Sequence, residues 1–499
     1  MSPGEIESTS QAGTGTCPVP TEQVEGTLQG KMSWWYLFAM ATASILGPWV
    51  VMSQFWYSVS GPSIALAFVI VGLICIPIGL VYGELSAMFP KTGGSFLFIK
   101  HGLGSEVSFW VSWALLLSYL ALMSYMESSF AVIIQQMWIS SMDVAAIAIL
   151  SLALTVVTFV LTWRRVDVSA TVQFFLFVYT ILAGCIYLIL LIFSKDFNPA
   201  VNWNPGAPYS GYFAFGTNGF LSGVGLMITM FFGFELIPQF AEECDYPHKK
   251  HWKVMLYSVV AAMVIYVSIC LVETAVRPLD AILSMPNFVG AIESRQIYGN
   301  WLAYPLVFAC IATLIGCIIG FWLGASRVMY SMGREGIMPH IYTRTNKHHQ
   351  PYIANITIFG ITVFLTLFCY FESTNWEPAL FTMMAIGVAI AYTFTCIAYV
   401  RLKYIIPNHK REWKTPGGAA MGVAATLCGV FITYWVFWSF STPSFTWSNT
   451  WALFCMFFVI VIVLRLYLWY DKRAHADKYY HLKDEVQLEI EAERATKAK

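Results

Sequence analysis

The amino-acid sequence predicts an all-α integral membrane protein with twelve transmembrane helices, in which two inverted repeats of five helices are followed by two further helices. Three observations support this fold class: the composition, twelve apolar runs, and breaks at matching positions in two of those runs. Of the 499 residues, 58% are hydrophobic and 11% are charged. Soluble domains carry roughly a quarter charged residues, so this composition is typical of a membrane protein.

The twelve apolar runs approach or exceed the roughly 20 residues that a bilayer requires. They lie near 34–59, 62–88, 106–137, 143–163, 168–194, 219–243, 252–276, 299–330, 352–371, 376–401, 420–440 and 449–470. We therefore expect one transmembrane domain at 33–471. It comprises repeat 1 at about 33–194, repeat 2 at about 219–401 and the extra helices at about 420–470.

The distribution of basic residues predicts the orientation of the chain. With twelve spans both termini lie on one side, and the loops of the other side carry only Lys195, Arg277 and Arg295. The terminal side then holds 25 of the 28 basic residues, which predicts that both termini are cytoplasmic. We expect 1–32 to be a disordered tail without a signal peptide, 472–499 to be a second tail, and the protein to lie in the plasma membrane.

Two of the predicted spans carry a break. The first reads ATASILGPWVVMSQFW, in which a proline follows Gly47, and the sixth, MITMFFGFELIPQFAEE, places Gly233, Glu235 and Pro238 within six residues. Gly and Pro weaken a helix, and the freed backbone groups cannot face lipid. The matching positions five spans apart indicate an inverted repeat whose broken helices hold a substrate near the midplane. For the sixth span alone, a kinked structural helix is the alternative.

Cysteine and histidine do not form the pattern of a disulfide framework or a metal site. The eleven cysteines lie mostly inside apolar runs, and all nine histidines fall on predicted cytoplasmic segments. An enzyme would require a nucleophile–base pair or metal ligands within the spans. We therefore expect no metal, no cofactor and no enzymatic activity.

Three motifs resemble those of the amino acid–polyamine–organocation superfamily of secondary transporters. They are FFGFE followed by AEE at 231–243, GELSAMFPKTGGSF at 83–96 and SRVMYSMGREGIMP at 326–339. Together with the spans and the two breaks, the resemblance covers 33–471. It implies the LeuT-type fold and the movement of an amino acid or small amine by alternating access, through proton coupling or exchange.

Three positions bear on the substrate and the coupling ion that this resemblance implies. The family's first break usually reads Gly-Ser-Gly or similar, whereas Trp49 places an indole there, so we expect a smaller or differently shaped substrate. Several members carry a lysine on the fifth span near the first break, where this chain has Thr180. Sodium coupling in this fold uses hydroxyls on span 8, which offers Thr313 without an adjacent Ser/Thr pair. Sodium symport is therefore disfavoured.

The candidate substrate-binding residues lie at the two breaks and on nearby aromatic positions. Backbone N–H and C=O groups freed at a break can bind a carboxylate and an ammonium, respectively. Aromatic side chains can stack on a cation or occlude the site, although ordinary packing is the alternative for each. The candidates are Ser44, Gly47, Pro48, Trp49, Tyr119, Glu127, Phe231, Phe232, Gly233, Phe234 and Phe321.

Four carboxylates lie within the predicted spans. Glu235 resembles the family's proton-sensitive carboxylate and is the candidate proton-coupling residue, with a structural cap as the alternative. Glu127 either recruits a cationic amine or forms a salt bridge. Glu273 precedes Arg277 by four residues, which predicts a helix ion pair, and Glu84 is expected to be a satisfied carboxylate at a helix end.

Other function classes fit the sequence less well. A channel would carry rings of charged or carbonyl ligands, and a sensor would carry a soluble output domain. The 28 residues after the last span are too few to fold as one. The alternatives are thus a sodium-coupled symporter, a transporter-fold sensor or a channel. The expected partners are an amino acid or amine substrate, protons as a candidate coupling ion and membrane lipids, with no nucleic acid, in a monomer or homodimer.

Overall fold

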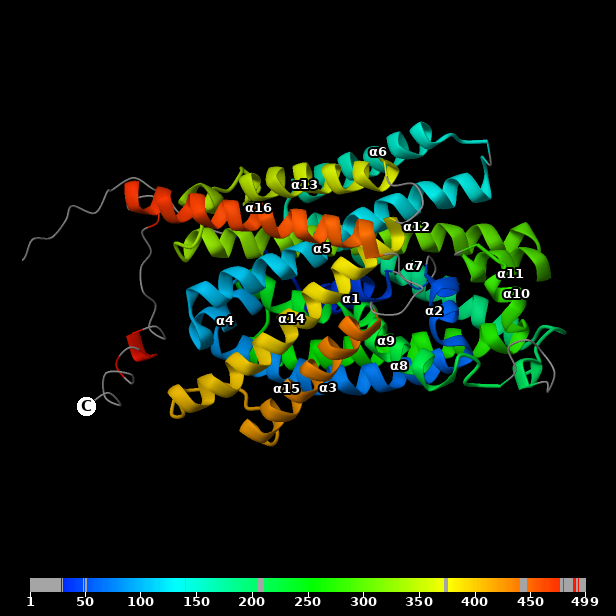
Figure 1. Ribbon diagram of the computed structural model, residues 1–499, viewed down its shortest axis with the longest axis horizontal. Coiled ribbons are helices and arrows are strands. Elements are labelled where there is room, and N and C mark those ends of the chain that lie inside the picture. The colour runs from blue at the N-terminus through cyan, green and yellow to red at the C-terminus, as the bar shows by residue number, and fades with distance from the viewer. Residues whose placement is uncertain are drawn as a thin grey trace, which may run out of the picture.

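A computed structural model provides the structure of the chain. It describes residues 28–475, apart from gaps at 29, 48, 50–51, 140, 204–210, 287, 372–375 and 440–446, and also residues 479, 488–490 and 492. Every regular element in this part of the chain is helical (Figure 1). The all-α prediction is therefore confirmed for the described residues.

The helices follow one another along the chain, with longer connections between α7 and α8 and between α12 and α13. The α-helices are α1 (Trp34–Leu46), α2 (Ser53–Ser60), α3 (Ile64–Met88), α4 (Ser95–Leu103), α5 (Ser105–Met137), α6 (Val144–Thr162), α7 (Val166–Ile192), α8 (Gly216–Leu226), α9 (His251–Val276), α10 (Leu279–Leu283), α11 (Val289–Ile297), α12 (Asn300–Arg334), α13 (Tyr352–Phe371), α14 (Trp376–Ile405), α15 (Gly418–Ser439) and α16 (Trp447–Ala474). Two 3₁₀ segments, η3 (Met227–Phe231) and η4 (Phe234–Glu243), follow α8.

Ten helical segments among the described residues are long and apolar enough to cross a membrane. The 13-residue α1 is a shorter apolar helix. A chain with this many such segments is an integral, multi-pass membrane protein. Large apolar side chains on the outer surface of the bundle, including Ile149, Phe175 and Leu427, are exposed and are suited to contact with lipid.

The bundle has two ends, which the loops distinguish by charge. The basic end carries α4 and the loops at 244–250 and 335–351. The far end carries α2, α10 and α11 and the loop that follows α9 (Figure 1). The far-end loops contain only three basic residues, Lys195, Arg277 and Arg295.

The first helix breaks where the sequence predicts. It ends at Leu46, the chain turns at Gly47, and a helix resumes as α2 at Ser53. The carbonyl oxygen of Ile45, freed by the break, accepts a hydrogen bond of 2.5 Å from the Tyr266 hydroxyl on α9. Because an unbonded carbonyl is costly at membrane depth, this hydroxyl stabilises the end of α1.

The sixth apolar segment also breaks, at Phe232 and Gly233. Phe232 is extended, and Gly233 has a φ of 137°, a conformation that favours glycine. A Cβ at Gly233 would lie 3.1 Å from the backbone nitrogen of Ile45 and 3.1 Å from the Cβ of Ser44. The two breaks therefore touch, and this close approach requires a residue without a side chain.

The helices that carry the breaks lie at the centre of the bundle. α1 packs against α7, α9 and α12, while α5 packs along α14 and α3 packs along α9. Nine of the thirteen residues of α1 are buried. The breaks are thus enclosed by α3, α5, α9, α12 and α14, which supply the side chains of the candidate site.

Candidate functional site

Three aromatic rings from three elements meet beside the second break. Tyr119 of α5, Phe232 at the break and Phe321 of α12 have ring centroids 4.7–5.3 Å apart. All three side chains are buried. These separations fit tilted aromatic packing, so the rings form one apolar wall. The sequence analysis names all three as candidate substrate-binding residues, and the structure brings them together.

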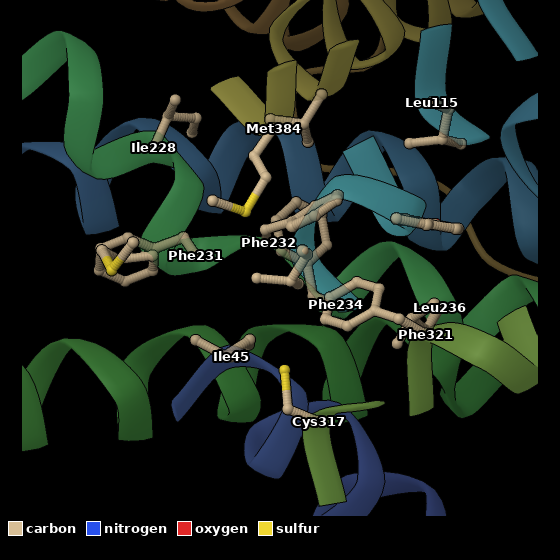
Figure 2. Close-up of a cluster of buried hydrophobic side chains, with 14 of the residues drawn as sticks. Ile45, Leu115, Ile228, Phe231, Phe232, Phe234, Leu236, Cys317, Phe321 and Met384 are labelled. Atoms are coloured by element: carbon tan, nitrogen blue, oxygen red, sulfur yellow. The ribbon is translucent and has the colours of Figure 1, made fainter. Parts of the chain in front are cut away.

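Phe231 and Phe234 face different surroundings. Phe234 lies 5.2 Å from the Tyr392 ring of α14 and 5.9 Å from the Tyr82 ring of α3. Phe231 packs on Tyr266 at 5.9 Å and lies apart from the other phenylalanines of the break (Figure 2). The run of three phenylalanines therefore spreads over the break, because the helix is interrupted between the second and third ring.

Glu235 is held by two donors at the start of the second half-helix. One carboxylate oxygen accepts a hydrogen bond of 2.8 Å from the backbone N–H of Gly233 and another of 2.6 Å from the hydroxyl of Tyr392. The side chain is fully buried. The first bond satisfies an amide freed by the break, and the second fixes the half-helix to α14. Both interpretations of Glu235, a proton carrier and a cap, are compatible with this geometry.

A set of buried polar atoms beside Glu235 forms no hydrogen bond of good geometry. It comprises the second oxygen of Glu235, the hydroxyl of Tyr119 and the side-chain amide of Gln239. The Tyr119 hydroxyl is directed toward both Glu235 and Gln239. Buried polar atoms are normally paired, so this group is suited to bind a polar solute or to pass a proton.

Ser44 belongs to the same centre, at the first break. Its hydroxyl is buried without a hydrogen-bond partner, and the Cβ that Gly320 lacks would clash with it. Gly47 lies against Cys317, because a Cβ there would stand 2.5 Å from the Cys317 sulfur. Pro48 lies outside the described residues. The first break is thus lined by α12.

Trp49 is buried on the α7 side of the first break. Its ring lies 3.4 Å from the position that a Cβ at Gly184 would take. Its indole nitrogen is buried without a hydrogen-bond partner. The structure therefore places the six-membered ring of the indole near α7, and Tyr119, Phe232 and Phe321 form their group without it.

Glu127 lies in a different part of the bundle from Glu235. One oxygen accepts 2.7 Å from Thr155 of α6 and 2.9 Å from Thr366 of α13. The carboxylate is fully buried, and among the described residues it forms no ion pair. Glu127 therefore joins α5 to two peripheral helices and does not line the aromatic group.

The other two intramembrane acids also have protein partners. Glu84 contacts Lys403 at 2.5 Å and Arg411 at 3.1 Å, which confirms the prediction of a satisfied carboxylate. The predicted ion pair between Glu273 and Arg277 is wrong, because Glu273 accepts from two tyrosine hydroxyls while Arg277 faces Asp196 at 3.7 Å. The loop after α9 turns at Arg277 and carries its side chain away from the helix.

Thr180 and Thr313 lie opposite each other between α7 and α12. Their hydroxyl oxygens are 2.9 Å apart, and each hydroxyl also contacts a helix carbonyl. The gap between α1, α7 and α12 at this point has no room for a water molecule. The two positions that the sequence singles out for coupling therefore satisfy one another.

The basic end beneath the site is closed by buried ion pairs. Arg327 of α12 makes two hydrogen bonds of 2.9 Å to Glu243, at the end of η4. Lys100 of α4 contacts Glu335, which follows α12. Burial acts to raise the pKa of the Glu335 carboxyl, but the Lys100 ammonium outweighs burial and holds that pKa below its ordinary value.

Three contributors to the site were missed by the sequence analysis. Tyr266, Tyr392 and Gln239 supply polar atoms at or beside the breaks. A hydroxyl or amide within an apolar span is a weak indication of such a role. Because the chain has 26 tyrosines, only their position next to the breaks distinguishes these two.

The described residues contain no group of three or more His, Cys, Asp or Glu side chains suited to hold a metal ion. The chemistry available at the breaks consists of a carboxylate, tyrosine and serine hydroxyls, a side-chain amide and aromatic rings. Groups of this kind can bind a polar solute or a proton, and none of those described here is an activated nucleophile.

Comparison with known proteins gives consistent results. Residues 32–464 match the model of the amino acid permease family. The branched-chain amino acid permease BcaP of Bacillus subtilis is 22% identical over 421 residues, which cover 81% of this chain and 88% of that protein. The aspartate-proton symporter of the same organism is 24% identical over 449 residues, covering 83% of this chain and 81% of that protein.

A plant protein shows a similar level of identity. Cationic amino acid transporter 3, mitochondrial, of Arabidopsis thaliana is 22% identical over 395 residues, which cover 74% of this chain. The chain spans 62% of the length of that protein, less than two thirds. Because the family match extends over most of the 499 residues, the chain belongs to the amino acid permease family, within the amino acid–polyamine–organocation superfamily, and is a membrane transporter of amino acids and not an enzyme.

Proposed function

We propose that the protein is a secondary active transporter that moves an amino acid with an apolar side chain by alternating access, with Glu235 as the proton-coupling residue. The observation that carries this proposal is the buried carboxylate at the second break, which lies beside polar atoms that form no good hydrogen bond and close to an aromatic wall. The half-helix ends at the two breaks offer backbone groups to the substrate's carboxylate and ammonium groups.

The composition of the centre favours an apolar side chain on the substrate. Near Phe232 and Phe321, the buried hydrophobic cluster also contains Met384 and Leu236 (Figure 2). Glu127 and Glu273, the carboxylates that could accompany a cationic side chain, are bonded elsewhere. Among the relatives, a permease named for branched-chain amino acids agrees with this substrate class. A cationic amino acid, the class named in another relative, would require a second free carboxylate in the site of this chain.

A proton is favoured over sodium as the coupling ion. Thr313, the span-8 hydroxyl, is engaged by Thr180 and by the Ala309 carbonyl. The gap beside them has no room for a water molecule, and a sodium ion would require oxygen ligands to be released there. The relative named as an aspartate-proton symporter supports proton coupling within the family. Exchange of one amino acid for another remains the second candidate mechanism.

The full architecture proposed for this function has twelve transmembrane helices. Transmembrane spans 1–5 and 6–10, counted as in the sequence analysis, form the inverted repeat. The helices α15 and α16 are the two extra spans, and the LeuT-type fold relates the two breaks. The excess of basic residues supports a cytoplasmic basic end, with both termini there, and a plasma-membrane location. The substrate then enters from the far end and leaves at the basic end.

Transport by purified protein in proteoliposomes tests this function. Labelled leucine, arginine, aspartate and small amines are offered with a pH gradient, with a sodium gradient, or with unlabelled amino acid inside. We expect uptake of leucine driven by the pH gradient. Uptake of arginine or of an amine alone would contradict the apolar substrate class, and uptake that needs only internal amino acid would establish exchange.

Glu235→Gln separates the two roles of the carboxylate. Glutamine keeps a carbonyl oxygen for the Gly233 amide and the Tyr392 hydroxyl but cannot titrate. We expect folded protein that binds substrate and has lost most of the pH dependence of transport. Glu127→Gln, a second buried carboxylate, is the matched comparison and should keep that dependence. A wild-type pH profile in Glu235→Gln would contradict the proton-coupling role.

A further inference from the structure

A pair of buried carboxylates lies at the far end of the bundle, on other elements than Glu235. We call Glu273 of α9 and Glu293 of α11 the far-end carboxylate pair. Both side chains are almost completely buried. Two tyrosines, Tyr57 of α2 and Tyr187 of α7, are fully buried around them. The pair thus lies where four elements meet, and one of them, α2, is the half-helix that follows the first break.

The contacts of the far-end carboxylate pair require a proton on one carboxyl group. The Tyr57 hydroxyl lies 2.8 Å from Glu273, and the Tyr187 hydroxyl lies 3.0 Å from Glu273 and 3.2 Å from Glu293. Three oxygen–oxygen contacts require three protons for full hydrogen bonding, and two hydroxyls supply only two. The third proton therefore belongs to a carboxyl group.

The surroundings assign that proton to Glu293. Glu273 accepts on both of its oxygens, which suits an ionised carboxylate. Glu293 has one oxygen against Tyr187, while its other oxygen is buried without a hydrogen-bond partner. A neutral carboxyl tolerates an unpaired oxygen better than an anion does. With Glu293 protonated, its carboxyl O–H donates to the Tyr187 oxygen, and the Tyr187 hydroxyl donates to Glu273.

Few other charges reach this group. The facing titratable groups are Tyr57 on α2, Tyr187 on α7, Cys270 and Glu273 on α9, and Arg277, which itself faces Asp196 at 3.7 Å. α12 packs against α11, but its charged side chains begin only at Arg327, toward the basic end. Burial first, and the charge of Glu273 second, raise the pKa of Glu293 well above its ordinary value, while Arg277 lowers it only in part.

The backbone of α11 closes directly over the pair. A Cβ at Gly290 would lie 3.0 Å from the Tyr187 hydroxyl and 3.1 Å from a Glu273 oxygen. A side chain at residue 290 would therefore make an unusually tight contact, and the neighbouring atoms would have to shift by a few tenths of an ångström. Repulsion between the two carboxylates would therefore act directly on the packing of α11 against Tyr187 and Glu273.

We propose that Glu293 is a proton-binding site of the transporter, and that its proton holds α11 closed over α2, α7 and α9 at the far end. Loss of the proton leaves two anions bridged by one hydroxyl in an apolar setting, which favours separation of α11 from the other three helices. Acid therefore favours the closed far end, and alkali favours the open one. The inference rests on the proposed alternating-access function, to which it adds a second proton site.

A distance measurement tests the site without requiring transport. Spin labels are attached at Gln296→Cys on α11 and Ala145→Cys at the start of α6, two exposed positions, in a Cys185→Ser background that removes an exposed thiol. In the otherwise wild-type protein in nanodiscs, we expect one short distance at about pH 5 and a growing longer one toward about pH 9. The ratio of the two populations should change by up to about tenfold per pH unit.

Glu293→Gln should keep the short distance at every pH, since its amide donates to Tyr187 and carries no charge. Gly290→Ala should raise the population of the longer distance even in acid, because the added methyl group crowds Tyr187 and Glu273. Asp280→Asn, which changes an exposed acid of α10, is the control and should follow the wild type. A pH-independent distance in the wild type, or a wild-type response in Glu293→Gln, would overturn the proposal. If transport fails while these distances respond as expected, only the proposed function is refuted.

Discussion

At the scale of single residues, the site depends on side chains that satisfy backbone groups freed by the breaks. The Tyr266 hydroxyl bonds the Ile45 carbonyl at the first break, and the Glu235 carboxylate bonds the Gly233 amide at the second. Each bond replaces one that an intact helix would make within itself. An irregular backbone is thereby tolerated at membrane depth, and the remaining unpaired polar atoms are concentrated in one place.

Trp49 is the residue whose role the structure refines most. Its ring packs near Gly184, so Trp49→Gly removes buried contacts with α7 and opens the first break. We expect a loss of about 3–5 kcal/mol in the free energy of unfolding and a broader range of competing amino acids. Thermal unfolding and competition assays measure the two effects.

Gly184→Ala provides a matched control for Trp49→Gly. The added methyl group would lie 3.4 Å from the indole, which is an ordinary contact, and the substrate range should not change. If Trp49→Gly loses stability but keeps the wild-type competition profile, the indole is a packing residue only and does not select the substrate.

At the scale of helices, buried ion pairs fix the second half-helix to its neighbours. Arg327 and Glu243 are both fully buried and join α12 to the end of η4, and Gln350 bonds the same guanidinium at 2.8 Å. Arg327 also lies over the Phe240 ring, at 5.2 Å from its centroid. This end of η4 must therefore move with α12 unless the ion pair breaks.

Arg327→Met tests the strength of this connection. It leaves the buried Glu243 carboxylate without its cation, so we expect a loss of about 3–5 kcal/mol in the free energy of unfolding. Arg327→Met combined with Glu243→Gln should be more stable than Arg327→Met alone, because no charge stays unpaired. Thermal unfolding in detergent measures both. Equal stability of the single and double variants would show that the charge pairing contributes little.

The contact between α4 and the end of α12 makes stability depend on pH. The pKa of Glu335 lies below its ordinary value because Lys100 outweighs the effect of burial. A depressed carboxyl pKa stabilises the folded state above the ordinary pKa, and this contribution is lost as the pH falls toward the folded-state value.

Glu335→Gln should therefore lower stability near neutral pH and flatten the decline of stability in acid. Melting temperatures measured from about pH 7 down to about pH 4 report both effects. Glu106→Gln, which changes a more exposed acid at the same end of the bundle, is the control. An unchanged acid profile in Glu335→Gln would mean that other carboxylates set the decline.

At the scale of the whole molecule, the two ends differ in charge and in the way they close. The basic end is closed by cation–carboxylate pairs, whereas the far-end carboxylate pair is closed by tyrosine hydroxyls. Ion pairs between opposite charges persist over a broad pH range, but two acids bridged by a hydroxyl depend on a proton. The two gates of an alternating-access cycle would then respond differently to acid.

The orientation of the molecule is tested by cysteine accessibility in intact cells. Gln296→Cys at the far end and Lys347→Cys at the basic end both change exposed residues. We expect a membrane-impermeant thiol reagent to modify the first and not the second, because the basic residues favour the cytoplasm. Modification of both after permeabilisation is the control, and the reverse pattern in intact cells would contradict cytoplasmic termini.

Much of this architecture could be predicted from the sequence because it depends on local chemistry. Glycine combined with proline, at 47–48 and at 233–238, weakens a helix through local backbone chemistry, and long apolar runs must cross a bilayer as helices. Glu84 was predicted as a satisfied carboxylate, and Lys403 and Arg411 bear this out. The aromatic run at the second break could likewise be located from its neighbours in the sequence.

Pairings between distant segments could not be predicted in the same way. The sequence places Arg277 one helical turn after Glu273, which favours an ion pair, yet the helix ends and two tyrosines from α2 and α7 bind the carboxylate instead. Glu127 could recruit an amine or form a salt bridge, and the hydroxyls that bind it come from Thr155 on the next helix and from Thr366, which is 239 residues along the chain. Local spacing contains no information on such partners.

The sequence by itself determined the membrane class, the positions of the breaks and the family motifs. The apolar composition indicates the membrane, and glycine and proline weaken a helix at their own positions. Only the tertiary structure decided that the two breaks touch, that Tyr392 and the Gly233 amide fix Glu235, and that α11 packs at Gly290 against Tyr187 and Glu273. The physical reason is that a buried carboxylate takes its properties from the donors around it, and in this bundle those donors come mainly from other helices.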